Sequence, residues 1–408
     1  MTALFDPERH QPLAGTAWDA TAARAAIERI VQETREAFTP DGLWPIHPND
    51  EEADDPPGPQ TSLYFGAAGV IWALDHLARE GAVSPGPSFA EHLPDVQSRS
   101  RRLFESEAWR RMLGSGWQTR SWLLGDSGIL FTRWKTAPSE PVLSALADTL
   151  AENTEDPALE LMWGAPGTML AALALYRASG SARWADLYRA GARALEASFQ
   201  WDESLGADIW TQTLYGSRAQ YLGPVHGFAG NAFALLQGRD LLEPGQWASL
   251  SSRFVRTLEV TAIRGAQGIN WAPRTGARPP EAPLLVQHCH GAPGMVTALS
   301  ALEAPIDELL LGAGELTWAA GPLAKGANLC HGTAGNAHAF LKLFQRTGDG
   351  EWLERARCFA MHAILQSEAE AAQLGRRRYS LWTGDLGLAC FLWECIRASA
   401  RFPTMDVL

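Results

Sequence analysis

The chain has 408 residues, and its 34 Lys and Arg against 46 Asp and Glu give a net charge of −12. Apolar residues make up 46% and charged residues 20%, an ordinary globular balance that excludes a disordered or collagen-like chain. The acidic excess excludes a global electrostatic footprint for nucleic acid or for an anionic membrane surface, so no nucleic-acid partner is expected.

Nothing in the sequence predicts a membrane protein or a secreted protein. No apolar run approaches the roughly 20 residues that span a bilayer, and the N-terminus lacks a basic segment followed by an apolar one. The five cysteines are sparse and odd in number, which argues against a disulfide framework. We therefore expect a cytoplasmic protein with reduced thiols and no integral membrane association.

One short motif recurs seven times along the chain: Gly-x-x-Gly followed by an apolar stretch of helical length. A single copy carries little information, but seven copies with the same continuation indicate a structural repeat. In chain order, the first glycines of the motif are Gly66, Gly125, Gly164, Gly227, Gly291, Gly332 and Gly384.

An amphipathic helix is predicted before each motif, because apolar residues recur there at helical spacing among Arg, Glu and Asp. The stretches that follow the glycines are apolar nearly all round, which predicts a buried inner set of helices inside an outer set. The outer helices are expected at 17–38, near 97–113, and at 139–152, 181–199, 245–262, 305–319 and 350–367.

Seven inner and seven outer helices in alternation predict one all-α domain over residues 1–408, an α/α toroid with its Gly-rich turns on one face. Glycine suits such turns because it permits positive φ and close backbone approach. An open solenoid of helical hairpins is the alternative. The irregular stretches 40–62, 200–224 and 263–288 are expected to be insertions on the glycine face, where functional loops usually lie.

Three repeats place a histidine directly before the first glycine, and two of these also place a cysteine one position earlier. The histidines are His226, His290 and His331, and the cysteines are Cys289 and Cys330. In a closed ring, equivalent repeat positions converge on the central opening. Two thiolates and an imidazole favour a tetrahedral zinc ion with an open fourth position, the arrangement of catalytic sites. The alternative is that each is an ordinary core residue.

Charged residues near the motifs are candidates for supporting roles. Asp126 and Asp385 each follow a first glycine, where a carboxylate either orients a ring histidine or caps the helix N-terminus. Lys325 precedes the second cysteine, and the run Arg376 to Arg378 precedes the seventh motif. These cations are either solvated surface residues or an anion site for substrate carboxylates near the metal.

Longer motifs around these residues resemble the lanthionine synthetase C-like family over nearly the whole chain. They are the seven Gly-x-x-Gly turns, QHCHGAPG at Gln287 to Gly294, NLCHGTAGNAHAF at Asn328 to Phe340, VHGFAG at Val225 to Gly230, and the tail RFP at Arg401 to Pro403. The resemblance implies a toroid of seven inner and seven outer helices, with zinc held by Cys289, Cys330 and His331.

The resemblance also implies roles for the remaining residues around the metal. His226 would be the catalytic acid or base, with Asp126 as its candidate partner. His290 would be a neighbour in the pocket rather than a ligand. Together with Lys325 and Arg378 of the candidate anion site, it is expected to contact the substrate.

Members of this family add a thiol to dehydroalanine or dehydrobutyrine. The peptide cyclases use a cysteine of the same peptide, whereas the eukaryotic-type members add glutathione to such residues in damaged proteins. This chain has His288 where the family usually has Trp, and Leu285 where peptide cyclases commonly have Arg. The sequence resembles the glutathione-adding branch more than the peptide cyclases. This resemblance lies in the two departures, the motif Cys-His-Gly-Ala-Pro-Gly, Lys325 and the Arg-Phe-Pro tail.

The resemblance therefore implies a zinc-dependent enzyme whose partners are a thiol such as glutathione and a dehydrated peptide or protein. Three rivals stay open. The first is a lanthipeptide cyclase, and the second is a glutathione-binding scaffold without enzymatic activity. The third is a toroidal glycosidase, for which Asp126 and Asp385 are the repeat-matched carboxylates.

Overall fold

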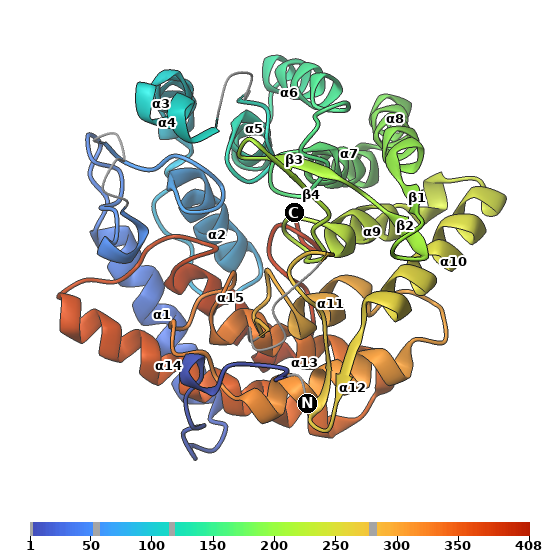
Figure 1. Cartoon of the computed structure of the whole chain (residues 1–408). Coiled ribbons are helices and arrows are strands. Elements are labelled where there is room, and N and C mark those ends of the chain that lie inside the picture. The colour runs from blue at the N-terminus through green and yellow to red at the C-terminus, as the bar shows by residue number, and fades with distance from the viewer. Residues whose placement is uncertain (1–2, 52–57, 114–118, 277–283) are drawn as a thin grey trace.

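The helices of the chain form two concentric rings around a filled centre (Figure 1). Helices that follow the Gly-x-x-Gly turns form the inner ring, and they alternate along the chain with the helices of the outer ring. The computed structural model describes residues 3–51, 58–113, 119–276 and 284–408.

The inner ring has seven helices in the described part of the chain, and each begins directly after the first glycine of its motif. Their side chains are buried nearly all round, as predicted. They are α2 (Ala67–Arg79), α5 (Asp126–Thr136), α7 (Ala165–Ser179), α9 (Phe228–Gln237), α11 (Ala292–Leu299), α13 (Thr333–Thr347) and α15 (Asp385–Arg397).

The helices of the outer ring are amphipathic. The helix α1 begins at the N-cap Asp19 and buries one stripe that includes Ala23, Ile27 and Ile30, because these positions recur at helical spacing. Among the described residues, no helix combines the length and the apolar character needed to cross a bilayer. The outer helices are α1 (Ala20–Glu36), α3 (Leu93–Glu105) with the short α4 (Glu107–Leu113), α6 (Glu140–Glu152), α8 (Ala182–Ser198), α10 (Pro244–Thr261), α12 (Asp307–Ala320) and α14 (Gly350–Leu374).

The inner ring is closed. Each inner helix contacts the next one along the chain, and the last, α15, contacts the first, α2. Outer helices pack against the inner ring, as in the pairs α7 with α8 and α13 with α14. These contacts confirm the α/α toroid and rule out the open solenoid.

The second glycine of every motif is explained by close packing. A Cβ atom built on it would lie 1.7–2.3 Å from the carbonyl oxygen six residues earlier, for example that of Leu329 for Gly335. A side chain there would push the turn away from the helix that it starts. Among the first glycines only Gly291 has a positive φ, at 109°, so close approach is the general reason for the motif and left-handed backbone is not.

Neighbouring turns are joined by backbone hydrogen bonds on the glycine face of the ring. Each of these bonds links the loop before one inner helix to the loop before another. The donor N–H groups and acceptor carbonyls are Leu123 to Met162, Tyr64 to Leu123, Trp382 to Tyr64, Cys330 to Trp382 and Cys289 to Cys330, at 2.9–3.1 Å.

Three small antiparallel hairpins lie within the predicted insertions 200–224 and 263–288. The strands are β1 (Gln200–Asp202) with β2 (Ala207–Ile209), β3 (Gln212–Leu214) with β4 (Ser217–Ala219), and β5 (Ile263–Gly265) with β6 (Gly268–Asn270). In the register of the first hairpin, Gln200 faces Ile209. Residues 52–57 and 277–283 of the predicted insertions lie outside the described residues.

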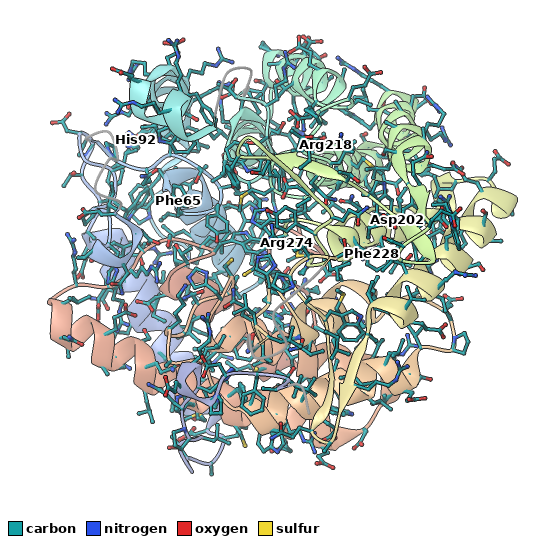
Figure 2. All side chains as sticks on the ribbon, viewed as in Figure 1. Phe65, His92, Asp202, Arg218, Phe228 and Arg274 are labelled. Carbon is teal, nitrogen blue, oxygen red and sulfur yellow. The ribbon has the colours of Figure 1, made fainter. Side chains whose placement is uncertain are left out.

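The C-terminal tail fills the middle of the ring, where the chain end is marked in Figure 1 and side chains crowd the centre in Figure 2. The ring of Phe402 is fully buried and stacks on that of His288 with centroids 4.3 Å apart. Thr404 accepts hydrogen bonds from two tryptophan indoles, and Asp406 forms a nearly buried ion pair with Lys342 at 2.8 Å. The tail thus belongs to the core.

The burial of Phe402 predicts that the tail contributes strongly to stability. Phe402→Ala removes a fully buried aromatic ring, and we expect the free energy of unfolding to fall by about 3–5 kcal/mol. Chemical denaturation followed by circular dichroism measures this loss. Leu365→Ala, at a side chain that is 51% exposed, is the matched control and should change stability by about 0.5 kcal/mol or less. Equal effects of the two substitutions would contradict a core role for the tail.

Candidate metal centre and active site

Two turns of the glycine face bring two cysteines and a histidine together. Cys289 precedes α11, and Cys330 and His331 precede α13. Their candidate ligand atoms all lie within 4.8 Å of one another. Both cysteines are buried, and the backbone N–H of Cys289 donates to the carbonyl of Cys330 at 3.0 Å. Contact between the two turns therefore places the ligand atoms.

The donor set fits a tetrahedral zinc ion. Zn–S bonds of about 2.3 Å and Zn–N bonds of about 2.0 Å place tetrahedral ligand atoms roughly 3.5–4 Å apart, so a small contraction of the observed cluster suffices. The thiols also interact with each other: their mutual hydrogen bond lowers the pKa of Cys289 and raises that of Cys330. A cation is what allows two buried neighbouring thiols to ionise together.

Each sulfur has a neutral hydrogen-bond donor beside it. The Nε2 of Gln287 donates to the Sγ of Cys289 at 3.0 Å, and the hydroxyl of Tyr64 hydrogen bonds to Cys330. Arg9 in turn donates to the Oε1 of Gln287 at 3.2 Å. Such outer contacts fix the orientation of metal ligands.

A histidine and a glutamate form a hydrogen-bonded pair next to this cluster. The Nδ1 of His226 lies 2.9 Å from the Oε2 of Glu160, whose side chain is fully buried. Burial opposes the charge of His226, but the hydrogen bond and charge of Glu160, with a contribution from Cys289, raise its pKa above the usual value. Glu160 thereby fixes the ring so that Nε2 is free for proton transfer.

Backbone packing explains why His226 lies near the cysteines. The loop before His226 contains Gly223, and a Cβ atom on this glycine would lie 2.1 Å from the carbonyl oxygen of Cys289 and 3.2 Å from the Nδ1 of His290. Only glycine allows the two turns to approach this closely. The ring of His290 lies 6.0 Å from that of His226, and burial, followed by the charge of His226, lowers its pKa to about 4.

The carboxylate beside His226 is not the one that the sequence suggested. Asp126 forms an ion pair with Arg101 at 2.7 Å instead. Asp126 begins an inner helix, whereas Glu160 lies in the loop of the neighbouring turn, and the ring brings that loop to His226. Glu160 lies four residues before the first glycine of its motif, the position that Gln287 occupies in the repeat of Cys289. The prediction from the repeats used only the residues next to that glycine and therefore missed Glu160.

The second aspartate considered in the sequence is also engaged. Asp385 accepts a hydrogen bond from Ser367 at 2.7 Å and lies 3.7 Å from Arg377, and burial raises its pKa to about 6. Asp126 and Asp385 are thus held by different partners, and neither lines the pocket beside the metal cluster.

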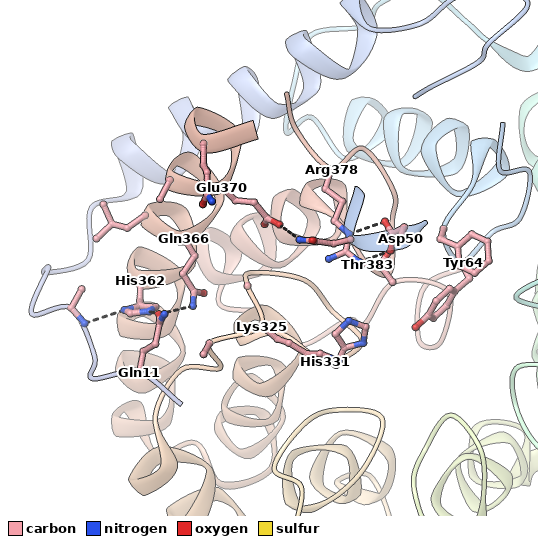
Figure 3. Close-up of a pocket in the computed structure, with 18 residues that line it drawn as sticks. Gln11, Asp50, Tyr64, Lys325, His331, His362, Gln366, Glu370, Arg378 and Thr383 are labelled. Carbon is pink, nitrogen blue, oxygen red and sulfur yellow. Dashed lines mark hydrogen bonds and ion pairs between the residues drawn. The ribbon is translucent and has the colours of Figure 1, made fainter. Parts of the chain in front are cut away.

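A pocket of about 910 Å³ opens beside the metal cluster. Tyr64 and His331 line it, and Lys325 lies next to His331 (Figure 3). Arg378 also lines the pocket, but Asp50 engages its guanidinium through two hydrogen bonds, one of them 2.7 Å long. Of the two predicted cations that line the pocket, Lys325 is therefore the one without an ion-pair partner among the described residues.

The other two arginines of the run, Arg376 and Arg377, make structural contacts. Arg377 is buried and paired with Glu33 and Glu368, and Arg376 donates to the carbonyl of Ile46 at 2.7 Å. The predicted anion site therefore has fewer cations than the sequence suggested, because two of its three arginines do not line the pocket.

Comparison with the sequences of known proteins gives three matches. Residues 142–407 match the family model described as lanthionine synthetase C-like protein. The chain is 33% identical over 195 residues to glutathione S-transferase LANCL1 of Danio rerio, covering 46% of each protein. It is 34% identical over 133 residues to LanC-like protein GCL1 of Arabidopsis thaliana, covering 30% of each. The matches thus span less than half the length of these relatives.

Among solved structures, the fold is similar to that of nisin cyclase. The TM-score is 0.60, with 14% sequence identity, and the superposition covers 92% of this chain and 94% of that one. At this identity the likeness concerns the fold alone.

The cluster predicts one zinc ion per chain, because its three donors come preassembled. Cys330→Ala should lower bound zinc at least tenfold, as measured by elemental analysis of protein purified without chelator. Cys358→Ala, which removes a half-buried thiol outside the cluster, is the control and should retain zinc. Helix content should stay unchanged, since the toroid has a large core. Full zinc retention after replacing both Cys289 and Cys330 would refute the assignment.

Proposed function

The chain belongs to the lanthionine synthetase C-like family, and from this premise we propose that it is a zinc-dependent enzyme that adds a small thiol to dehydrated residues. The thiol is glutathione or a close analogue, and the acceptors are dehydroalanine or dehydrobutyrine residues of peptides or proteins. The observation that carries the proposal is the cluster of Cys289, Cys330 and His331, which adjoins both a large pocket and the His226–Glu160 pair.

The cluster supports the first part of the proposed chemistry. Cys289, Cys330 and His331 would hold a zinc ion, which when bound stabilises a thiol as its thiolate at neutral pH. Gln287 and Tyr64 hold the two cysteine ligands in place. The pocket wall at Tyr64 and His331 gives a thiol access to this point.

The His226–Glu160 pair supports the second part. The thiolate sulfur forms a bond to the β-carbon of the dehydrated residue, and the electron pair of the broken π bond moves to the α-carbon. The Nε2 of His226 delivers a proton there, which completes the thioether product. Glu160 holds the ring in the required tautomer and stabilises its protonated form.

Three observations favour an external thiol. Lys325 lines the pocket as a cation suited to a carboxylate of a small peptide thiol. The position before Cys289 is a buried histidine, His288, stacked on the tail. The relative from Danio rerio carries the name glutathione S-transferase. All five cysteines are free thiols, in keeping with a reducing cytoplasm as the proposed location.

Lanthipeptide cyclisation is the second candidate function. It uses the same metal and acid chemistry, and it is the activity named for nisin cyclase, a solved structure with the same fold. The difference lies in the source of the thiol, which in a cyclase is a cysteine of the dehydrated peptide.

A product assay separates the two functions. We expect purified protein, incubated with a dehydroalanine peptide that also carries a cysteine, to form a glutathione adduct at millimolar glutathione. Mass spectrometry detects the adduct as a gain of one glutathione, whereas ring closure leaves the mass unchanged and consumes the free thiol. Efficient ring closure without an adduct would establish the cyclase and reject the proposal.

Replacing the proposed acid should abolish most of the activity and keep the metal. We expect His226→Ala to lower the rate of adduct formation by roughly 10²–10⁴-fold, the range for a lost general acid, with zinc content unchanged. Glu160→Gln keeps the shape but removes the charge, and its rate should fall less. Asp126→Asn is the control, because Asp126 contacts Arg101 instead. Loss of zinc in His226→Ala would instead identify His226 as a ligand.

A further inference from the structure

Four ionised side chains line the pocket beside the metal cluster, and two of them neutralise each other. Asp50 and Arg378 form the bidentate pair described above, and both side chains are nearly buried. Lys325 and Glu370 are the other two. Because the paired charges cancel, the pocket offers a ligand one separate cation and one separate anion.

Glu370 has one oxygen engaged and one available. Its Oε1 accepts a hydrogen bond from the Nδ2 of Asn49 at 2.7 Å and lies 3.7 Å from the Nε2 of His47. Its Oε2 has no hydrogen-bond partner among the described residues, and a Cβ atom on Gly326 would lie 3.5 Å from it. The available oxygen therefore borders the loop that carries Lys325.

His47 does not neutralise Glu370. The Nδ1 of His47 accepts the backbone N–H of Asn49 at 3.2 Å, which places the ring proton on Nε2. Burial lowers the pKa of His47, and the charge of Glu370 only partly opposes this effect. The imidazole is thus a neutral neighbour that supplies no positive charge to the carboxylate of Glu370.

Lys325 is the separate cation of the pocket. Its side chain lies beside His331 in the lining of the pocket (Figure 3), so the cation is close to the cluster. Glu370 projects into the same pocket from α14 (Figure 3). The volume of about 910 Å³ falls within the roughly 300–1,000 Å³ of small-ligand sites, which leaves room for a short peptide.

We propose that Glu370 binds the α-ammonium group of the thiol co-substrate, so that the pocket selects zwitterionic thiol peptides with a free amino group. This inference rests on the proposed function. The thiol lies at the metal cluster, a carboxylate lies at Lys325, and the ammonium group lies at the Oε2 of Glu370. A thiol without an amino group leaves Glu370 unpaired, and one with a carboxylate at that place is repelled, which makes Glu370 a specificity-determining residue.

A binding experiment tests the inference without relying on turnover. The probe is S-methylglutathione, which keeps the ammonium and carboxylate groups but cannot form a thiolate, and its affinity is measured by isothermal titration calorimetry. We expect Glu370→Gln to weaken binding at least tenfold, the effect of losing one charge-assisted hydrogen bond. The glutamine keeps an oxygen for Asn49, so the local structure should persist.

Two controls isolate the ammonium contact. The N-acetylated form of the same probe lacks the ammonium charge, and we expect it to bind wild type and Glu370→Gln with equal affinity. Glu354→Gln changes an exposed acid of α14 outside the pocket, and it should leave the affinity for both probes unchanged.

The outcomes separate this inference from the proposed function. Equal affinities of wild type and Glu370→Gln for S-methylglutathione, equal losses for both probes, or no binding of S-methylglutathione to wild type would each overturn the ammonium contact. Thiol addition by wild type in the product assay would then still support the proposed function. Absence of any adduct would reject the function, whatever Glu370 binds.

Discussion

The structure depends on contact between the turns of the inner ring. Backbone hydrogen bonds run from turn to turn on the glycine face, and one of them joins Cys289 directly to Cys330. The approach is close enough that a single Cβ atom on Gly223 would collide with the carbonyl oxygen of Cys289 in another turn. Ring closure thus holds residues that are far apart in sequence at fixed positions in one site. The glycines permit this because they allow the turns to approach closely.

Some residues that support the site come from turns without a Cys-His-Gly sequence. The first motif supplies Tyr64 beside Cys330, and the loop before the third supplies Glu160 beside His226. Arg9, from the N-terminal segment, supports Gln287. A site held by such outer contacts is ordered before any ligand arrives, which is what positioning of metal ligands and of a proton donor requires.

The sequence predicts the helices and the metal cluster for one reason: both follow the repeat. Helical periodicity located the outer helices, and equivalent positions in a ring brought Cys289 and Cys330 together. Contacts that obey no repeat were missed. Glu160 reaches His226 from a neighbouring loop, and the pairing of Arg378 with Asp50 joins opposite ends of the chain. The tail packs as core, which the repeat did not predict because the tail belongs to no Gly-x-x-Gly unit.

The central claim is that two thiolates and one imidazole hold a metal at which an external thiol binds. X-ray absorption spectroscopy at the zinc edge, before and after addition of glutathione, tests it most directly. The account predicts two sulfur neighbours at about 2.3 Å in the protein alone, and three after glutathione is added. A spectrum without sulfur neighbours, or one with two sulfurs that glutathione leaves unchanged, would contradict it.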